Sequence, residues 1–161
     1  TVLDNLMLGR FMHERTNIFH YGLFTSVAVK KELEARQVCQ TIVELLDLGD
    51  VRDELVSELS YGIQKRVELG RVLAMDPNLL MLDEPMAGMN AEEKQEMVRY
   101  IYRIMDEYKT SVFMIEHDMG IIMAIAERIM VLEFGREIAT GLPDEIQANP
   151  AVINAYLGAE T

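Results

Sequence analysis

The segment Leu79–Pro85 restricts the possible folds of this chain more than any other stretch. It consists of four apolar residues, two acids and a proline, in that order. A short apolar run that ends in polar residues is typical of a strand buried on both faces of a sheet. Pro85 ends the strand, because proline has no N–H group to donate to a neighbouring strand. The sequence therefore predicts an α/β fold with this strand in its core.

Asp83 and Glu84 follow the apolar residues at the carboxyl end of the predicted strand. In open α/β sheets, ligands bind at that edge. One carboxylate suits a hard cation such as Mg²⁺, which prefers oxygen ligands, and the other suits removal of a proton from water. From these residues alone, a strand that simply ends in a polar turn is an equal alternative.

Ser111–Ile115 is a second apolar run, and we expect it to be a second buried strand. His117 follows it between two acids. If the two strands are parallel, His117 reaches the same sheet edge as Asp83 and Glu84. A single histidine is usually structural, but this position favours a function for His117.

Apolar residues at helical spacing predict helices along the rest of the chain. The most regular pattern covers Lys30–Leu48, with Gly49 as the C-terminal cap. A helix capped by Thr1 is expected to give way to a less regular segment over Gly9–Tyr21. Further helices are expected after Ser60, after Asn90 and over Met119–Arg128. A hairpin of Ile129–Glu133 and Arg136–Ala139 is expected to turn at Phe134-Gly135. Helices are also expected to start at Pro143 and Pro150.

Ser60 and Gly62 lie at the start of one of these helices. Ser60 can cap the helix, and Gly62 lets another backbone or a phosphate come close. A serine and a glycine at a helix N-terminus also suit an anion, because free N–H groups and the helix dipole favour negative charge. From these residues alone, an ordinary capped helix is the simpler interpretation.

Composition excludes several classes of function. The 161 residues fit one domain with a substantial core. The formal net charge of −12 disfavours nucleic acid and anionic lipid as partners. Cys39 is the only cysteine, so no internal disulfide forms, which fits a reducing compartment. No apolar run approaches the roughly 18 residues of a membrane span, and we expect no signal peptide.

Four motifs occur in a specific order along the chain: Leu59–Glu68, Leu79–Pro85, Ala87–Asn90 and Ile115–Asp118. In this order and spacing they resemble the signature motif, Walker B strand, D-loop and switch histidine of the nucleotide-binding subunits of ABC transporters. The resemblance is closest to the ATPases of branched-chain amino acid importers, and it extends into the C-terminal residues. Two departures are Ile63, where most signatures carry glutamine, and Asn90, where the D-loop more often ends in aspartate.

The resemblance implies a partial P-loop NTPase fold, α/β in class. Residues 1–75 are then a helical subdomain that ends in the signature helix. Residues 76–161 are the Walker B half of a mainly parallel sheet, with flanking helices and a C-terminal hairpin. The sequence contains no Gly-x-x-x-x-Gly-Lys-Ser/Thr loop, which cradles phosphates in this fold. We therefore expect the carboxyl-terminal part of a longer ATPase, inactive when isolated.

The resemblance also implies the roles of individual residues at an ATP site shared by two subunits. Asp83 would hold Mg²⁺, Glu84 would polarise the attacking water, and His117 would contact the γ-phosphate. Five residues of the signature and the D-loop would bind the nucleotide held by the second subunit: Ser60, Tyr61, Gly62, Gln64 and Asn90.

The implied partners are transmembrane permease subunits and a second ATPase subunit, with no nucleic acid. The membrane is contacted only through the permease, at its cytoplasmic face. The aromatic residues around the less regular segment fit either a packed loop or a surface for the permease; they are Phe11, Phe19, Tyr21 and Phe24.

Two alternatives remain from the sequence. An ABC-type ATPase of DNA repair or chromosome structure is disfavoured by the acidic charge and by the lack of a basic stripe or heptad repeats. A non-catalytic helical interaction module or half-site is the stronger alternative, because the phosphate loop is absent from these residues.

Overall fold

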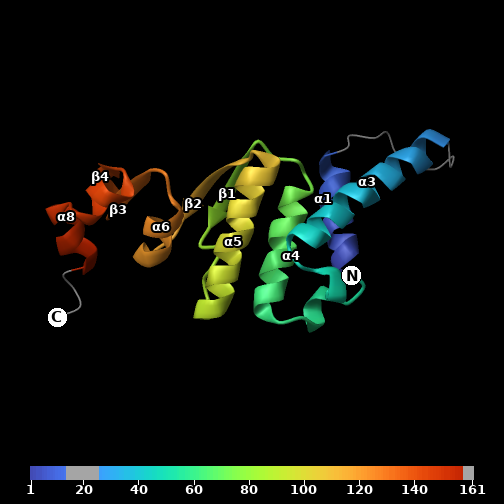
Figure 1. Cartoon of the computed structure of the whole chain (residues 1–161), viewed down its shortest axis with the longest axis horizontal. Coiled ribbons are helices and arrows are strands. Elements are labelled where there is room, and N and C mark those ends of the chain that lie inside the picture. Colours follow the sequence, from blue (N-terminus) through green and yellow to red (C-terminus); the bar gives the residue numbers. More distant parts are fainter. Residues whose placement is uncertain (14–25, 158–161) are drawn as a thin grey trace. The chain divides into compact units, whose positions relative to one another are not determined.

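The computed structural model describes residues 1–13 and 26–157, which mix helices with short strands as the sequence predicts (Figure 1). They form two compact units, Thr1–Met114 and Ile115–Thr161, and each is described by itself. The sequence-based boundary between residues 75 and 76 concerns subdomains of a family fold, and it stays a prediction. None of the described helices is both long and apolar enough to cross a membrane.

Helix α1 (Val2–His13) begins as predicted, because the Asp4 N–H donates to the Thr1 hydroxyl at 3.2 Å. The prediction that the regular structure ends at Gly9 is wrong for residues 9–13, which continue the helix. Gly9 lies against the backbone carbonyl of Arg71 in α4 (Tyr61–Leu73), where a Cβ atom would overlap that oxygen. Glycine therefore serves close helix packing here. The rest of the predicted irregular segment, with Phe19 and Tyr21, lies outside the described residues, as does Phe24.

Helix α3 (Ser26–Leu45) buries one side that includes Cys39 and Ile42. The predicted cap at Gly49 is wrong, since the left-handed residue that ends the helix is Asp47, with φ of 50°. The Leu48 N–H then donates to the Val43 carbonyl at 2.9 Å, which is the bond expected after a left-handed cap. Two single-turn 3₁₀ helices follow, η1 (Gly49–Val51) and η2 (Val56–Glu58).

Helix α5 (Ala91–Tyr108) has the predicted buried stripe, with Met97, Ile101 and Ile104 in the core. A chain of polar contacts also joins α4 and α5 to the turn that follows α3. The Arg66 guanidinium donates to the Tyr100 hydroxyl at 2.9 Å, and that hydroxyl donates to the Asp47 carboxylate at 3.1 Å. Tyr100 is buried, and its hydroxyl has both a donor and an acceptor, so burying it costs little.

Strands β1 (Leu79–Asp83) and β2 (Ser111–Ile115) pair in a small parallel sheet, connected by α5. The prediction that both strands are buried on both faces is wrong. In β1, Leu80 is fully buried, but Leu79 and Met81 are 52% and 70% exposed. β2 alternates in the same way, with Phe113 exposed. Within the described part of the first unit only one face of the sheet is covered, so alternate residues point to solvent.

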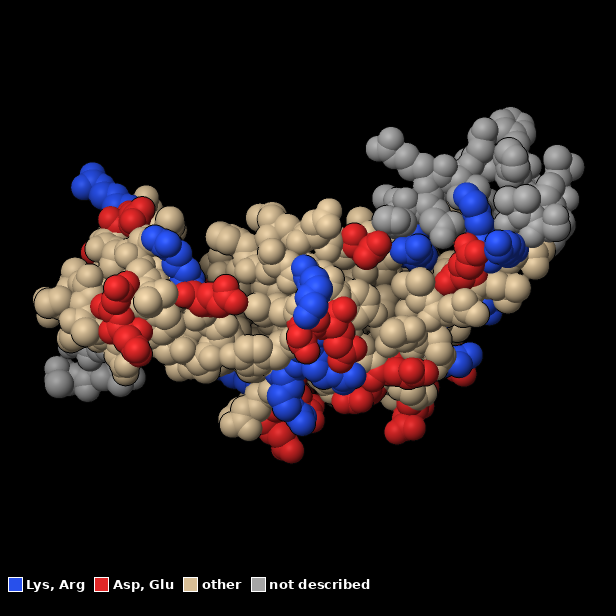
Figure 2. Space-filling model, turned by 45° about the horizontal axis from the view of Figure 1, so that its top comes forward, with Lys and Arg blue, Asp and Glu red and all other residues tan. Residues whose placement is uncertain are grey.

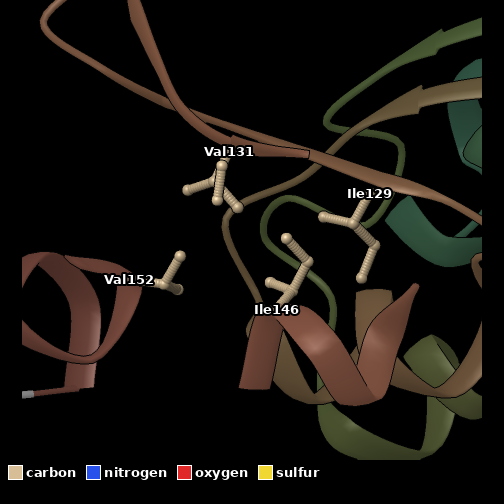
Figure 3. Close-up of a cluster of buried hydrophobic side chains, with 5 residues drawn as sticks. Ile129, Val131, Ile146 and Val152 are labelled. Atoms are coloured by element: carbon tan, nitrogen blue, oxygen red, sulfur yellow. The ribbon is translucent and has the colours of Figure 1, made fainter. Parts of the chain in front are cut away.

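The second unit consists of α6 (Met119–Ile125), the antiparallel strands β3 (Ile129–Glu133) and β4 (Arg136–Gly141), α7 (Pro143–Gln147), α8 (Pro150–Val152) and the π-helical turn η3 (Ile153–Leu157). The hairpin turns at Phe134 and Gly135, both with positive φ, as predicted. Figure 3 shows its core, in which Ile129 and Val131 of β3 pack with Ile146 and Val152.

Helix α6 is shorter than predicted, because Ala126 already has an extended backbone with ψ of 135°. The helix starts predicted at Pro143 and Pro150 are confirmed, since each proline occupies the first turn.

Candidate functional site

Asp83 and Glu84 lie exposed at the carboxyl end of β1, as predicted. Glu84 has φ of 44°, a left-handed conformation that costs a non-glycine residue roughly 1–3 kcal/mol. The turn is closed by the Ala87 N–H, which donates to the Glu84 carbonyl at 3.1 Å. A strained backbone at an exposed acid, directly after a strand, fits a residue whose direction matters for function.

The turn Ala87–Asn90 connects this acid pair to α5. Met86 and Met89 are buried and anchor the turn in the core of the first unit. Gly88 has φ of 76°, where glycine is favoured over residues with a side chain. The turn is therefore fixed by apolar packing on the inside and by one conformationally required glycine.

Asn90 caps α5, as predicted from the sequence. Its side-chain oxygen accepts hydrogen bonds from the N–H groups of Glu92 and Glu93, at 2.9 and 3.0 Å. The Glu93 carboxylate accepts in return from the Asn90 N–H at 2.9 Å, which completes a capping box. The predicted nucleotide contact of Asn90 stays a prediction.

Ser60 occupies the N-cap position of α4, with an extended ψ of 155°. The predicted capping bond is absent, because the side chain of Ser60 accepts no hydrogen bond from the helix. Gln64 instead turns back, and its side-chain amide donates to the Leu59 carbonyl at 2.8 Å. The start of α4 is thus held by a glutamine on its second turn, and the Ser60 hydroxyl is not used for capping.

Gly62 is buried, and the group that comes close to it is a side chain from α5. A Cβ atom on Gly62 would lie 2.6 Å from Oε1 of Glu93. Within the chain, the group that approaches Gly62 is thus the Glu93 carboxylate, and the expectation that Gly62 lets a phosphate come close stays a prediction. The sequence analysis did not single out Glu93, although the Asn-x-x-Glu spacing of a capping box was available as a signal.

Tyr61 is 49% exposed beside this contact. A Cβ atom on Gly88 would lie 3.4 Å from the edge of the Tyr61 ring, so the ring lies over the turn before α5. The Lys65 ammonium lies 5.6 Å from the centre of the same ring. Its hydrogen bond to Glu68 raises the pKa of Lys65, so this cation stays charged at neutral pH. The structure brings Ser60–Gly62 together with the turn Ala87–Asn90.

His117 belongs to the second unit, so its predicted pairing with Glu84 stays a prediction. The imidazole is exposed, and its Nδ1 lies 3.9 Å from the carboxylate of Glu116. Glu116 itself is almost fully buried, with 2% of its side chain exposed. Asp118, the next residue, caps α6 by accepting from the Ile121 N–H.

Among residues 1–13 and 26–157, no three His, Cys, Asp or Glu side chains gather as a set of metal ligands. Mg²⁺ at nucleotide sites is held by one or two carboxylates, with water and phosphate oxygens as the other ligands. The exposed carboxylate of Asp83 fits that donor set.

Comparison with protein families decides the assignment. The ABC transporter family matches residues 4–87, just over half of the chain. The chain belongs to this family. A second description, branched-chain amino acid ATP-binding cassette transporter, matches residues 136–161. The four motifs expected from the sequence thus lie in a chain of the ABC transporter family. The fold of this chain is a partial P-loop NTPase fold.

Two relatives carry the name high-affinity branched-chain amino acid transport ATP-binding protein. LivG of Salmonella typhimurium and BraF of Pseudomonas aeruginosa are each 37% identical to the chain. The match covers 98% of this chain and 62% of each relative. The chain therefore spans less than two thirds of the length of these relatives.

Solved structures give the same fold. An ATP-binding cassette of an ABC transporter in its ADP conformation is similar with a TM-score of 0.78 at 26% identity, over 98% of this chain and 63% of that one. A nucleotide-free ATP-binding cassette is similar with a TM-score of 0.73 at 25% identity, over 97% of this chain and 62% of the other.

Proposed function

We propose that these residues form part of the ATP-hydrolysing subunit of an importer for branched-chain or other hydrophobic amino acids. The observation that carries the proposal is the exposed acid pair Asp83 and Glu84 at the end of β1, with Glu84 held at φ of 44°. The names of LivG and BraF, which specify branched-chain amino acid transport, support the solute class.

In this proposal, residues 1–75 are the helical subdomain and residues 76–161 belong to the catalytic core. The partners are the transmembrane permease subunits and a second ATPase subunit. The protein then binds the cytoplasmic face of the membrane through the permease alone. The mixed distribution of acidic and basic side chains on the face in Figure 2 supports a protein partner over nucleic acid.

Each predicted catalytic residue has one role. Asp83 holds Mg²⁺, Glu84 orients the attacking water and accepts its proton, and His117 donates to the γ-phosphate. When bound, Mg²⁺ neutralises the charge that develops on the phosphate oxygens. The chain contributes positioning and charge, which supply most of the catalysis in phosphoryl transfer.

The start of α4 and the turn before α5 face the ATP held by the second subunit. Backbone N–H groups at a helix N-terminus suit a phosphate, and Ser60 does not use its hydroxyl as a cap. The residues assigned to this half of the site are Ser60, Tyr61, Gly62, Gln64 and Asn90.

The test uses what we call the complete ATPase, a protein in which these 161 residues follow a segment with a phosphate-binding loop. We expect Glu84→Gln to keep ATP binding and lower the steady-state turnover by about 10²-fold or more, the range for loss of a general base. His117→Ala acts in the same direction. Glu92→Gln is the matched control, since Glu92 is an exposed acid nearby. Unchanged hydrolysis in Glu84→Gln would contradict the assignment.

A non-catalytic half-site is the second candidate, and the lack of a phosphate loop in the 161 residues favours it. In that case the chain binds a partner without hydrolysing ATP. The two candidates separate in the complete ATPase, because only the first predicts hydrolysis that depends on Glu84 and uptake of labelled leucine or valine by vesicles that contain the permease.

A further inference from the structure

The carboxylate of Glu93 touches two parts of the first unit that are far apart in the sequence. One oxygen, Oε2, accepts from the Asn90 N–H at 2.9 Å and completes the capping box of α5. The other oxygen, Oε1, lies 2.6 Å from the position that a Cβ atom on Gly62 would take. One half-buried side chain therefore joins the start of α4 to the turn before α5.

A second contact lies beside the first. The Tyr61 ring lies over Gly88, with 3.4 Å between the ring edge and the Cβ position of that glycine. We call Ser60–Gly62, Gly88–Asn90 and Glu93 the α4–α5 junction. Tyr61 thus contacts Gly88, and the neighbouring Gly62 contacts Glu93. These two contacts fix both the distance and the relative orientation of the start of α4 and the turn before α5.

A small, partly open pocket lies beside the junction. Ser60, Gly62 and Glu93 help to line it, and its volume of about 30 Å³ is enough for one water molecule. A methyl group at Gly62 would overlap the Glu93 carboxylate, so this carboxylate would have to shift from the position in which it accepts from the Asn90 N–H. A change at the start of α4 is therefore felt at the cap of α5.

We propose that Glu93 is a positioning residue, which holds the signature residues Ser60–Gly62 and the turn Gly88–Asn90 in one fixed geometry within the subunit. Both segments face the second subunit in the proposed function, on which this inference rests. A subunit with an intact junction presents both segments to its partner at once, so nucleotide-dependent pairing of the two subunits requires Glu93, although Glu93 touches no nucleotide.

The first arm of the test measures thermal unfolding of the 161-residue chain in a double-mutant cycle. Glu93→Ala removes half of the capping box and should lower Tm by about 2–4 °C. Gly62→Ala should lower Tm at least as much, because its methyl group displaces Glu93. In the Glu93→Ala background, Gly62→Ala should cost nothing further. Additive losses would show that the two residues do not share a contact and would overturn the inference.

The second arm measures ATP-dependent dimerisation of the complete ATPase by size exclusion, in a Glu84→Gln background. Glu93→Ala should raise the ATP concentration for half-maximal dimerisation by about tenfold, with ATP binding to the monomer unchanged. Glu93→Gln should restore dimerisation, because glutamine also completes a capping box. Glu92→Ala, which removes the neighbouring exposed acid, should leave dimerisation unchanged.

The variant Ile104→Val distinguishes a purely structural role, because it destabilises the buried C-terminal half of α5 without touching the start of this helix. If this variant and Glu93→Ala lower dimerisation equally at equal loss of Tm, positioning by Glu93 is excluded. If the parent protein neither binds nor hydrolyses ATP, the proposed function itself fails. If it does both, and Glu93→Ala dimerises like the parent, only the positioning role fails.

Discussion

Several single residues in this chain have a conformation or a partner that their neighbours in sequence do not suggest. Glu84 carries the acid of the proposed site on a left-handed backbone. Tyr100 is buried, yet its hydroxyl has a donor in Arg66 and an acceptor in Asp47. Burial raises the pKa of Tyr100, as it does for the Cys39 thiol and for Tyr108. These groups stay neutral in the folded protein to a higher pH than in the unfolded chain.

The raised pKa of Tyr100 makes a prediction about stability at alkaline pH. A phenol whose pKa is higher in the folded state stabilises the fold fully below the unfolded pKa of about 10, and that stability is lost as the pH rises above it. Tyr100→Phe should cost about 0.5–1.5 kcal/mol at pH 7, the usual net contribution of a hydrogen bond, because the exposed Asp47 and the half-buried Arg66 can turn to water when they lose this partner. Above pH 10, the free energy of unfolding of Tyr100→Phe should fall less steeply with pH than that of the parent protein.

Urea unfolding of the parent and Tyr100→Phe at pH 7 and 10.5 measures both effects. Cys39 and Tyr108 contribute equally to the two proteins, so the difference between them isolates Tyr100. Parallel pH curves would show that the phenol does not titrate differently on folding.

The helices are held at their ends by different devices. Thr1 caps α1 with its hydroxyl, Asp118 caps α6 with its carboxylate, and α5 has a complete capping box. α4 differs from these three helices, because Ser60 makes no side-chain cap and Gln64 donates to the Leu59 carbonyl. The start of α4 therefore depends on its contacts with α5, which links the stability of the two helices.

Asn90→Ala tests the N-terminal cap of α5, which is one side of this junction. We expect it to lower the free energy of unfolding by about 1 kcal/mol, the usual cost of losing an N-cap. Asn90→Asp should stay within a few tenths of a kcal/mol of the parent, because aspartate caps as well as asparagine. Urea titration of the three proteins measures these free energies of unfolding. If Asn90→Ala and Asn90→Asp lose the same amount, the loss does not come from the cap.

At the scale of the whole chain, the sheet of β1 and β2 has one covered and one open face within the described residues of the first unit. The exposed side chains of Leu79, Met81 and Phe113 form an apolar surface on strands that both lie at a sheet edge. Such edges pair readily with other chains. The surface charge is mixed on the face in Figure 2, and the formal net charge of −12 keeps copies of the chain apart in dilute solution.

The isolated 161-residue chain should bind Mg-ATP poorly. It carries the acid pair and the signature, but its sequence has no phosphate loop to surround the β- and γ-phosphates. Isothermal titration should give no measurable binding at submillimolar ATP. A Kd of about 1 µM corresponds to roughly −8 kcal/mol. Binding of that strength would mean that another part of the chain replaces the phosphate loop.

Local patterns were enough to locate most elements, and they named the candidate site residues, whose roles stay predictions. The sequence predicted the order of the signature, Asp83, Glu84 and Asn90. It also predicted the cap of α5 and the hairpin turn at Phe134. Each of these features depends on residues that are close together in the sequence. Strand positions followed from the apolar runs of β1 and β2.

Long-range packing settled the rest. Gly9 lies where the backbone of α4 comes close to α1, and Gly62 lies against the Glu93 carboxylate. The neighbours that pack on β1 cover only one of its faces. The sequence could not show this, because a strand covered on one face and a strand covered on both can have the same apolar run. The junction between α4 and α5 was therefore beyond sequence patterns, since its contacts join residues about 30 positions apart whose distance is decided only when the helices pack.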